Sequence, residues 1–286
     1  MKKEKVWLIT GCSTGLGRAI SENVLAAGYR AAVGARKLND VQDLADKYPE
    51  SALAVKLDVT EPEDIRNSIE QTQKKFGTID VVVNNAGIGY FAAIEESEDA
   101  AVRKMFEVNF FGLASLNKAV LPLFRQKRSG HIINIASVGA LIVYPSLGFY
   151  HATKFAVDGY SEALSKEVSP LGIKVILIEP SAFRTEWAGS NASGSQTEIT
   201  DYAPTAGAAK QAYLDSYGKQ AGDPDRAAQA IIKVVESATP PLRLLLGVEA
   251  LEEARKKLTE LQKDIDNWEE TTIGADFPKN EQTIPA

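Results

Sequence analysis

The sequence predicts a doubly wound α/β domain, in which helices cover both faces of a seven-stranded parallel sheet. Short apolar runs alternate with longer amphipathic segments along most of the 286 residues. The runs are apolar at consecutive positions, as expected for strands that are buried on both faces. An α/β chain of this length often folds around one sheet, so we expect a single domain over residues 1–286 with its core at about 5–247.

The expected elements follow one another in the order strand, helix, strand. The strands are expected at residues 6–10, 31–35, 53–59, 79–87, 131–137, 173–180 and 242–247. Helices are expected from about Leu16, after the second strand, over 62–76, in a long stretch ending at Phe124, and from about Phe149.

Residues 188–209 interrupt this alternation. The segment is rich in glycine, serine, alanine and threonine and follows the sixth expected strand. A loop of this length in a compact domain is usually either functional or simply disordered. We interpret it as a mobile loop over a substrate site, with plain loop disorder as the alternative.

The C-terminal segment predicts a helical extension at about 249–270. Its apolar residues recur at intervals of three and four: Leu251, Ala254, Leu258, Leu261, Ile265 and Trp268. Three heptads are marginal for a free coiled coil. We therefore expect this helix to dock on the protein's own body, with a subunit contact as the alternative.

Composition excludes several classes of function. The net charge of −6 provides no general attraction for nucleic acid or anionic lipid. The single cysteine, Cys12, and the two histidines, His131 and His151, are too few for a disulfide or a metal site built from these residues. After the basic start only Val6–Ile9 form an apolar run, and no stretch reaches the roughly 20 residues that span a bilayer, so we expect a cytoplasmic protein.

The first strand leads into "TGCSTGLG", which contains Gly11, Gly15 and Gly17. Glycines allow positive φ and a close approach of the backbone to phosphate, and the following helix N-terminus offers N–H donors. The spacing differs from Gly-x-Gly-x-x-Gly, but the pattern still favours a bound dinucleotide.

The end of the second strand indicates which dinucleotide is bound. An acidic residue at this point would bind the ribose 2′-hydroxyl of NAD, whereas arginine accommodates a 2′-phosphate. The sequence there is "VGARK", with Arg36 and Lys37 and no carboxylate. This favours NADP(H) over NAD(H).

Tyr150 and Lys154 are four residues apart and so share one face of the expected helix. An ammonium beside a phenol lowers the pKa of the phenol from about 10, which would suit acid or base chemistry near neutral pH. Ser137 ends the strand 131–137, where its hydroxyl would reach the ligand crevice of a parallel sheet. The three residues are candidates for one catalytic site.

Together these motifs resemble the short-chain dehydrogenase/reductase family. The resemblance rests on "TGCSTGLG", "NNAG" at 84–87, Asn109 in "VNFFG", Ser137 and "YHATK" at 150–154, and it covers residues 5 to about 247. It implies a Rossmann fold in which Tyr150 exchanges a proton with the substrate oxygen, Lys154 binds the nicotinamide ribose and Ser137 polarises the carbonyl. Asn109 would break the regularity of its helix and hold a water in a proton relay.

The resemblance also implies the residues that bind the cofactor. These are Gly11, Ser13, Thr14, Gly15, Leu16, Gly17, Arg36, Asp58, Val59, Asn85, Ala86, Gly87, Tyr150, Lys154, Pro180 and Thr185. The family usually has Pro-Gly where this chain has Pro180-Ser181. A positive φ at Ser181 would cost on the order of 1 kcal/mol.

Apolar residues are expected around the substrate: Phe91, Leu141, Ile142, Val143, Tyr144, Phe183 and Trp187. They favour a bulky apolar ketone or aldehyde, or the corresponding alcohol, as the substrate. His151 follows Tyr150 but points about 100° away on a helix, so we expect a structural role for it.

The leading interpretation is an NADP(H)-dependent oxidoreductase that interconverts a carbonyl and an alcohol. A dinucleotide sensor without turnover is the alternative from another class, and an epimerase or dehydratase that retains its NAD(P) is a closer one. The small-molecule substrate is the expected partner, and a homodimer or homotetramer is expected from the family resemblance.

Overall fold

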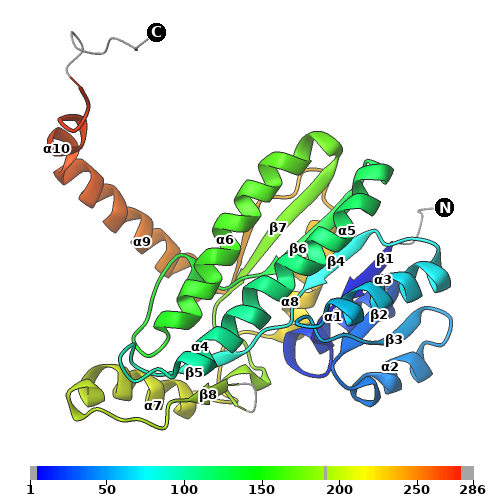
Figure 1. Ribbon diagram of the computed structural model, residues 1–286, viewed down its shortest axis with the longest axis horizontal. Helices are drawn as coiled ribbons and strands as arrows, with labels where there is room; N and C mark the ends of the chain where they lie inside the picture. The colour runs from blue at the N-terminus through cyan, green and yellow to red at the C-terminus, as the bar shows by residue number, and fades with distance from the viewer. Residues whose placement is uncertain (1–4, 190–191, 278–286) are drawn as a thin grey trace.

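The structure is a computed structural model that describes residues 5–189 and 192–277. Seven parallel strands form the central sheet in the order β3-β2-β1-β4-β6-β7-β9, which confirms the doubly wound fold (Figure 1). The strands are β1 (Val6–Ile9), β2 (Arg30–Ala35), β3 (Ala52–Lys56), β4 (Val81–Asn84), β6 (Gly130–Ile135), β7 (Ile173–Pro180) and β9 (Arg243–Leu246). The order reverses between β1 and β4, so a ligand crevice is expected at the carboxyl ends of these two strands.

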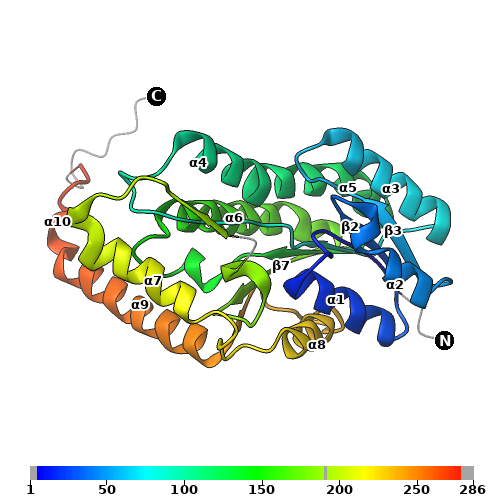
Figure 2. The same ribbon diagram turned by 90° about the horizontal axis from the view of Figure 1, so that it is seen from below.

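Helices cover both faces of the sheet (Figure 2). One face carries α1 (Gly15–Ala26) and α8 (Pro224–Val235), and the other carries α3 (Pro62–Phe76), α5 (Leu113–Lys127) and α6 (Gly148–Val168). The short helix α2 (Gln42–Lys47) precedes β3, and α4 (Asp99–Phe106) precedes α5.

The strand β1 shows why its sequence is apolar at every position. Trp7 and Ile9 pack into the core on one side of the sheet, with Ile20 of α1. Leu8 points to the other side and packs in the core that contains Phe124 of α5. All four residues of β1 are fully buried because both faces of the sheet are covered.

The segment 188–209 contains more secondary structure than the expected loop. The strand β8 (Ala192–Gly194) pairs in parallel with β5 (Gly89–Phe91), and short helical turns cover Thr200–Tyr202 and Ala203–Gly207. The helix α7 (Ala208–Asp215) already begins at residue 208. The partners are remote in sequence: Ser195 donates to the carbonyl of Glu96 at 2.6 Å, which a reading of local composition could not reveal. Residues 190 and 191 lie outside the described part of the chain.

The expected C-terminal helix is present as α9 (Val248–Asn267), followed by α10 (Glu269–Ile273). The expectation that it docks on the protein's own body is wrong for most of its length. Of its apolar residues only Ala250 and Ala254 are buried. The sheet ends at β9, and beyond the first two turns α9 projects away from the body (Figure 1).

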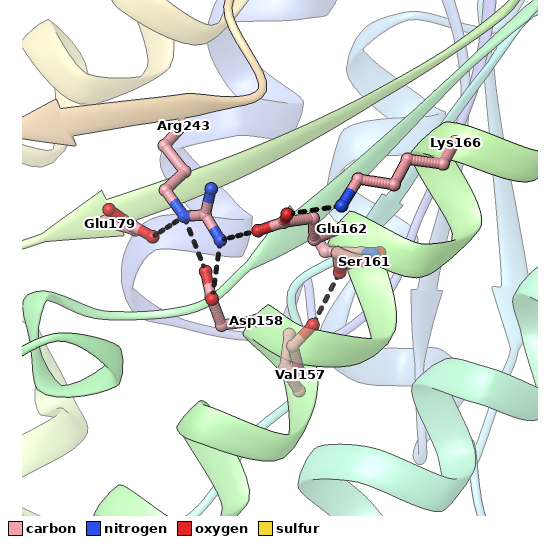
Figure 3. A network of polar contacts seen from close by, with 8 residues as sticks. Val157, Asp158, Ser161, Glu162, Lys166, Glu179 and Arg243 are labelled. Carbon is pink, nitrogen blue, oxygen red and sulfur yellow. Dashed lines mark hydrogen bonds and ion pairs between the residues drawn. The ribbon is translucent and has the colours of Figure 1, made fainter. Parts of the chain in front are cut away.

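Arg243 connects the last strand of the sheet to α6 (Figure 3). Its guanidinium donates to both carboxylate oxygens of Asp158 at 2.9 and 2.7 Å and to Glu162 at 2.7 Å. A third carboxylate, Glu179 of β7, lies 3.8 Å from Nε of Arg243. These contacts bind β9 and β7 to the helix that contains Tyr150 and Lys154.

The backbone at Ser181 differs from the expectation. Ser181 does not have positive φ, so the expected strain is not present; its N–H donates to the carbonyl of Leu246 at 2.9 Å. Gly247 has φ +103°, and a Cβ there would lie 2.3 Å from the Ser181 hydroxyl.

Within residues 5–189 and 192–277, no helix is long and apolar enough to cross a membrane.

Candidate active site

A cavity of about 730 Å³ opens at the carboxyl ends of the strands, beside the β1/β4 crevice. Nearly all of the candidate site residues line it: Gly11, Ser13, Thr14, Gly15, Leu16, Arg36, Asp58, Val59, Asn85, Ala86, Gly87, Ser137, Tyr150, Lys154, Pro180 and Thr185. Gly17 and Asn109 do not line the cavity; they lie behind its wall.

The glycine loop between β1 and α1 forms one end of the cavity. Gly11 and Gly15 have φ of +69° and +59°, which side chains other than glycine rarely adopt. Gly17 is required by space, because a Cβ there would lie 2.2 Å from the carbonyl oxygen of Gly11. The first turn of α1 has no acidic residue, so its N-terminus is free to attract an anion. These features fit a dinucleotide pyrophosphate.

Asn85 and Thr10 hold this loop against the end of β4. The Asn85 amide donates to the carbonyls of Thr10 and Gly11 at 3.0 and 3.1 Å. The Thr10 hydroxyl accepts the N–H groups of Asn85 and Ala86, both at 2.9 Å. The side chain of Asn85 therefore fixes the loop, while Asn85 also contributes to the lining of the cavity.

Arg36 lies at the end of the cavity that follows β2. It is exposed and lines the cavity, as do Asp58 and Val59, whereas Lys37 is not among the lining residues. No carboxylate follows β2 directly, because the strand ends at Ala35 and Arg36 comes next. The residue that follows β2 in this part of the cavity is therefore a cation and not a carboxylate.

The structure brings Ser137, Tyr150 and Lys154 together in the middle of the cavity. Ser137 accepts the N–H of Gly139 at 3.0 Å and also forms a hydrogen bond with Tyr150. Lys154 donates to the carbonyl of Ile135 at 2.9 Å, and its Nζ lies 5.7 Å from the centre of the Tyr150 ring. Tyr150 and Lys154 are both less than 10% exposed.

Burial determines the protonation of these groups. It raises the pKa of Tyr150 to about 12, although the hydrogen bond from Ser137 acts in the opposite direction. It lowers the pKa of Lys154 to about 8. The expected lowering of the tyrosine pKa by Lys154 is therefore not found in the protein alone, where burial raises the pKa and only the hydrogen bond from Ser137 opposes it. At neutral pH Tyr150 is a phenol that can donate a proton.

Asn109 lies beneath these residues, in a helix of irregular geometry. The helix widens into a π-helical turn at Glu107–Gly112, between α4 and α5, in agreement with the expected irregularity. The Asn109 side chain accepts the N–H of Ile88 at 2.8 Å and donates to its carbonyl at 3.0 Å and to Thr153 at 3.1 Å. It thereby links the segment after β4 to α6.

Both ring nitrogens of His151 have backbone partners, as expected for a histidine with a structural role. Its Nε2 accepts the N–H of Tyr144 at 2.9 Å, and its Nδ1 lies 2.9 Å from the carbonyl of Gly139. These partners require a neutral ring with the proton on Nδ1, and burial lowers the pKa of His151 accordingly. His151 also lines the cavity, so it holds the wall formed by the segment after Ser137.

The other end of the cavity is mainly aromatic. Tyr144, Phe183 and Trp187 line it as expected, and Trp187 lies 4.9 Å from Tyr150 between ring centres. Phe91 is not a lining residue; it packs behind Trp187 at 5.7 Å between ring centres.

The remaining apolar candidates do not line the cavity. Leu141 and Ile142 pack in the small core around Ala250, and Val143 is exposed.

Several lining residues were not found from the sequence. Leu147 reaches the cavity from the residue before α6 and Ser193 from β8, whereas Tyr213, Ser216, Gln220 and Glu249 reach it from α7, α9 and the segments between. Nothing in the local sequence marks them, since their position depends on how distant segments pack. Glu249 lies close enough to Tyr144 to contribute, after burial, to raising the pKa of that tyrosine to about 12.

Comparison with known proteins assigns the chain to a family. The family model described as short chain dehydrogenase matches residues 5–196. A curated relative, Oxidoreductase BOA17 of Botryotinia fuckeliana, is 38% identical over 95% of this chain and 99% of its own length. The 3-ketodihydrosphingosine reductase of Bacteroides thetaiotaomicron is 35% identical over 85% of this chain and 88% of its own. The chain belongs to the short-chain dehydrogenase/reductase family, and it is an oxidoreductase of that type.

Solved structures agree with this assignment. A short-chain dehydrogenase from Streptomyces avermitilis aligns over 96% of this chain and 100% of its own, with a TM-score of 0.89 and 39% identity. An alcohol dehydrogenase from Thermococcus sibiricus, complexed with 5-hydroxy-NADP, is 26% identical over 85% of this chain and 96% of its own, with a TM-score of 0.71. A 3-ketoacyl-(acyl-carrier-protein) reductase from Brucella melitensis, complexed with NADH, is 25% identical at the same coverage and TM-score. The last two of these structural neighbours thus hold nicotinamide nucleotides of both kinds.

Proposed function

We propose that this protein is an NADP(H)-dependent enzyme that reduces an apolar ketone or aldehyde, or oxidises the corresponding alcohol. One observation carries the proposal. A single cavity joins a glycine loop at one end, the group Ser137, Tyr150 and Lys154 in the middle, and an aromatic surface at the other end. A relative named for reducing a ketone, 3-ketodihydrosphingosine, supports the direction of the chemistry.

The residues at the glycine loop would hold the nucleotide. Its pyrophosphate would lie against Gly11, Gly15 and the N-terminus of α1, and Arg36 would hold a 2′-phosphate. Lys154 would bind the ribose next to the nicotinamide, and Thr185 would contact the nicotinamide. When bound, the nucleotide supplies or accepts the hydride.

The proton chemistry belongs to Tyr150. Because burial raises its pKa to about 12, Tyr150 is protonated at neutral pH and can donate to a carbonyl oxygen that becomes an alkoxide. Ser137, which is hydrogen-bonded to Tyr150, would hold the same oxygen. Lys154 lies behind the tyrosine, and a water held by Asn109 would return a proton to Tyr150 by way of Lys154.

The residues that line the aromatic end of the cavity favour an apolar substrate without a carboxylate. Tyr144, Trp187 and Tyr213 supply aromatic surface at this end, and Glu249 adds a negative charge. The cationic lining residues lie elsewhere, after β2, in α4 and in α6: Arg36, Lys104 and Lys154. A neutral or positively charged carbonyl compound therefore fits better than an anionic one.

The test is oxidation of NADPH, followed at 340 nm, with a panel of apolar and polar ketones, aldehydes and quinones. Tyr150→Phe should lower kcat by about 10³-fold or more while NADPH still binds. Turnover of apolar carbonyls by this variant at the wild-type rate would contradict the role of Tyr150. NADPH binding without turnover of any carbonyl or alcohol would contradict the enzymatic function.

The cofactor preference is tested separately with Arg36→Ala. Its loss of charge should raise KM for NADPH by about 10- to 100-fold and leave KM for NADH nearly unchanged. Lys37→Ala is the matched control, since Lys37 does not line the cavity. Equal effects of the two substitutions, or equal use of NADPH and NADH by the wild type, would contradict the preference.

A further inference from the structure

The carboxylate of Glu98 connects two segments that are far apart in the chain. Its Oε1 accepts the hydroxyl of Ser195 at 2.9 Å and the N–H of Gln196 at 3.1 Å, and these partners lie 97 and 98 residues later in the sequence. Its Oε2 accepts the hydroxyl of Tyr90 in β5. Glu98 therefore ties the chain after β8 to β5 as a charged acceptor, which forms stronger hydrogen bonds than a neutral one.

Glu96 forms a second connection between the same two segments. Its Oε1 accepts the N–H of Ile199 at 2.7 Å, and its Oε2 accepts the N–H of Ala93 at 3.0 Å. The backbone carbonyl of Glu96 also accepts the hydroxyl of Ser195, at 2.6 Å, and Ser195 is buried. The hydrogen bonds from Ile199 and Ser195 lower the pKa of Glu96 and Glu98, respectively, so both are ionised at neutral pH. We call Glu96 and Glu98 the acidic clamp.

The clamped segment carries part of the cavity wall. Trp187, Ser193 and Tyr213 line the cavity, and we call them the loop wall. Ser193 belongs to β8, which pairs in parallel with β5 beside α7 (Figure 1). Phe91 of β5 packs behind the loop wall, with its ring centre 5.5 Å from that of Tyr213 and 5.7 Å from that of Trp187. The position of the loop wall therefore depends on how the segment around β8 is held against β5.

We propose that the acidic clamp positions the loop wall and thereby determines how well the cavity binds large carbonyl compounds. The proposal rests on the function proposed above, since it concerns the substrate of that reaction. Neither Glu96 nor Glu98 is among the lining residues, so the clamp acts through the loop wall. The strands β5 and β8 pair over only Gly89–Phe91 and Ala192–Gly194, and a two-stranded pairing of this kind is marginal on its own. The clamp supplies the hydrogen bonds that fix it.

The two glutamates should differ in how well they tolerate glutamine. Both oxygens of Glu96 face backbone N–H groups, which cannot turn to become acceptors. In Glu96→Gln the amide N–H₂ group must therefore meet another donor, whichever way it is turned. One oxygen of Glu98 faces the hydroxyl of Tyr90, which can rotate and accept instead. Glu98→Gln should thus have the smaller effect.

The first experiment measures hydrogen–deuterium exchange of the full chain by mass spectrometry and needs no substrate. In Glu96→Gln the amides of residues 195–202 should exchange about 10-fold faster than in the wild type, because the clamp no longer holds them. Glu98→Gln should accelerate the same amides less. Exchange in β1 and α6 should not change, which shows that the variants are folded. Asp99→Asn is the matched control, because the exposed Asp99 pairs with Arg103 of its own helix. Unchanged exchange of residues 195–202 in both clamp variants would overturn the proposal.

The second experiment compares the largest and the smallest carbonyl compounds that the wild type reduces. Glu96→Gln should raise KM for the larger compound by about 10-fold, because that compound loses contacts with the loop wall that are remote from its carbonyl. KM for the smaller compound, KM for NADPH and kcat for the smaller compound should change by less than about 2-fold. Equal changes of KM for both compounds would overturn the proposal. A wild type that reduces no compound would contradict the proposed function instead, and the exchange measurement would then decide alone whether the clamp holds the loop wall.

Discussion

Glu179 provides a prediction with a calculable magnitude. Its side chain is fully buried at the end of β7, and neither carboxylate oxygen accepts a hydrogen bond from the described residues. Burial and the negative charge of Asp158 raise its pKa to about 8 from 4.5, although Arg243 acts in the opposite direction. Glu179 is therefore largely protonated in the folded protein at pH 7, whereas it is ionised in the unfolded chain.

The sign of the pH dependence follows from this difference. An acid whose pKa is raised by folding favours the folded state most at pH values below its unfolded pKa. This contribution is lost as the pH rises from about 4.5 to about 8. At pH 7 the loss amounts to at most about 3 kcal/mol, since each pKa unit corresponds to about 1.4 kcal/mol.

Glu179→Gln replaces the carboxyl group with a neutral group of the same shape, so it should remove this loss. We expect the variant to exceed the wild type by less than about 1 kcal/mol in the free energy of unfolding at pH 5 and by about 2–3 kcal/mol at pH 7. Urea unfolding followed by circular dichroism at pH 5, 6, 7 and 8 measures the difference. Equal stability at pH 7, or a difference that does not vary with pH, would refute the reasoning.

Glu162→Gln is the matched control in the same network (Figure 3). Hydrogen bonds with Lys166 and Arg243 hold the pKa of Glu162 at about 2. The ionised Glu162 therefore contributes to the free energy of unfolding above the pKa that it has in the unfolded chain, and this contribution is lost as the pH falls. Glu162→Gln should thus be less stable than the wild type at pH 7. The two glutamine variants should thus change stability in opposite directions.

Three further predictions concern the cavity and its helix. Gly17→Ala should weaken NADPH binding by about 100-fold in a fluorescence titration, because its Cβ would lie 2.2 Å from the Gly11 carbonyl oxygen. Gly159→Ala should stabilise the protein by up to about 1 kcal/mol in urea unfolding and preserve NADPH binding, because no atom lies within 4 Å of the added Cβ in α6. In a series of acetophenones with aminomethyl, methyl or carboxyl groups at the para position, kcat/KM should fall in that order. Glu249→Gln should reduce the ratio of kcat/KM between the aminomethyl and the carboxyl compound by about 5-fold. An unchanged ratio would show that Glu249 does not select the substrate charge.

The sequence predicted the sheet and the cofactor end of the cavity because these depend on local patterns. A strand covered on both faces is apolar at consecutive positions, as in β1, and the phosphate loop is marked by glycines that no other residue can replace. Tyr150 and Lys154 could be paired because a helix brings residues four apart to the same face. Each inference needed only the neighbours of a residue along the chain.

The rest depended on contacts between distant segments. The segment 188–209 acquires structure through Glu96 and Glu98, about 100 residues earlier, so its composition alone suggested a loop. The pKa of Tyr150 depends on burial, which the spacing to Lys154 does not reveal. The docking of α9 was incorrectly expected because a seam of apolar residues shows that a contact surface exists, without showing which surface covers it.

The connection between Arg243 and α6 has a consequence for how reaction geometry is maintained. Tyr150, Lys154, Asp158 and Glu162 follow one another every four residues, so they form a single line along α6. The first two face the cavity, and the last two are held by an arginine at the outer edge of the sheet. The hydrogen bonds of Arg243 with Asp158 and Glu162 therefore fix the rotation of α6 about its own axis. This rotation also determines the direction in which the Tyr150 hydroxyl points. Under the role proposed for Tyr150, and since a displacement of about 1 Å can cost on the order of 100-fold in rate, the last strand of the sheet aligns the reaction from two helical turns away.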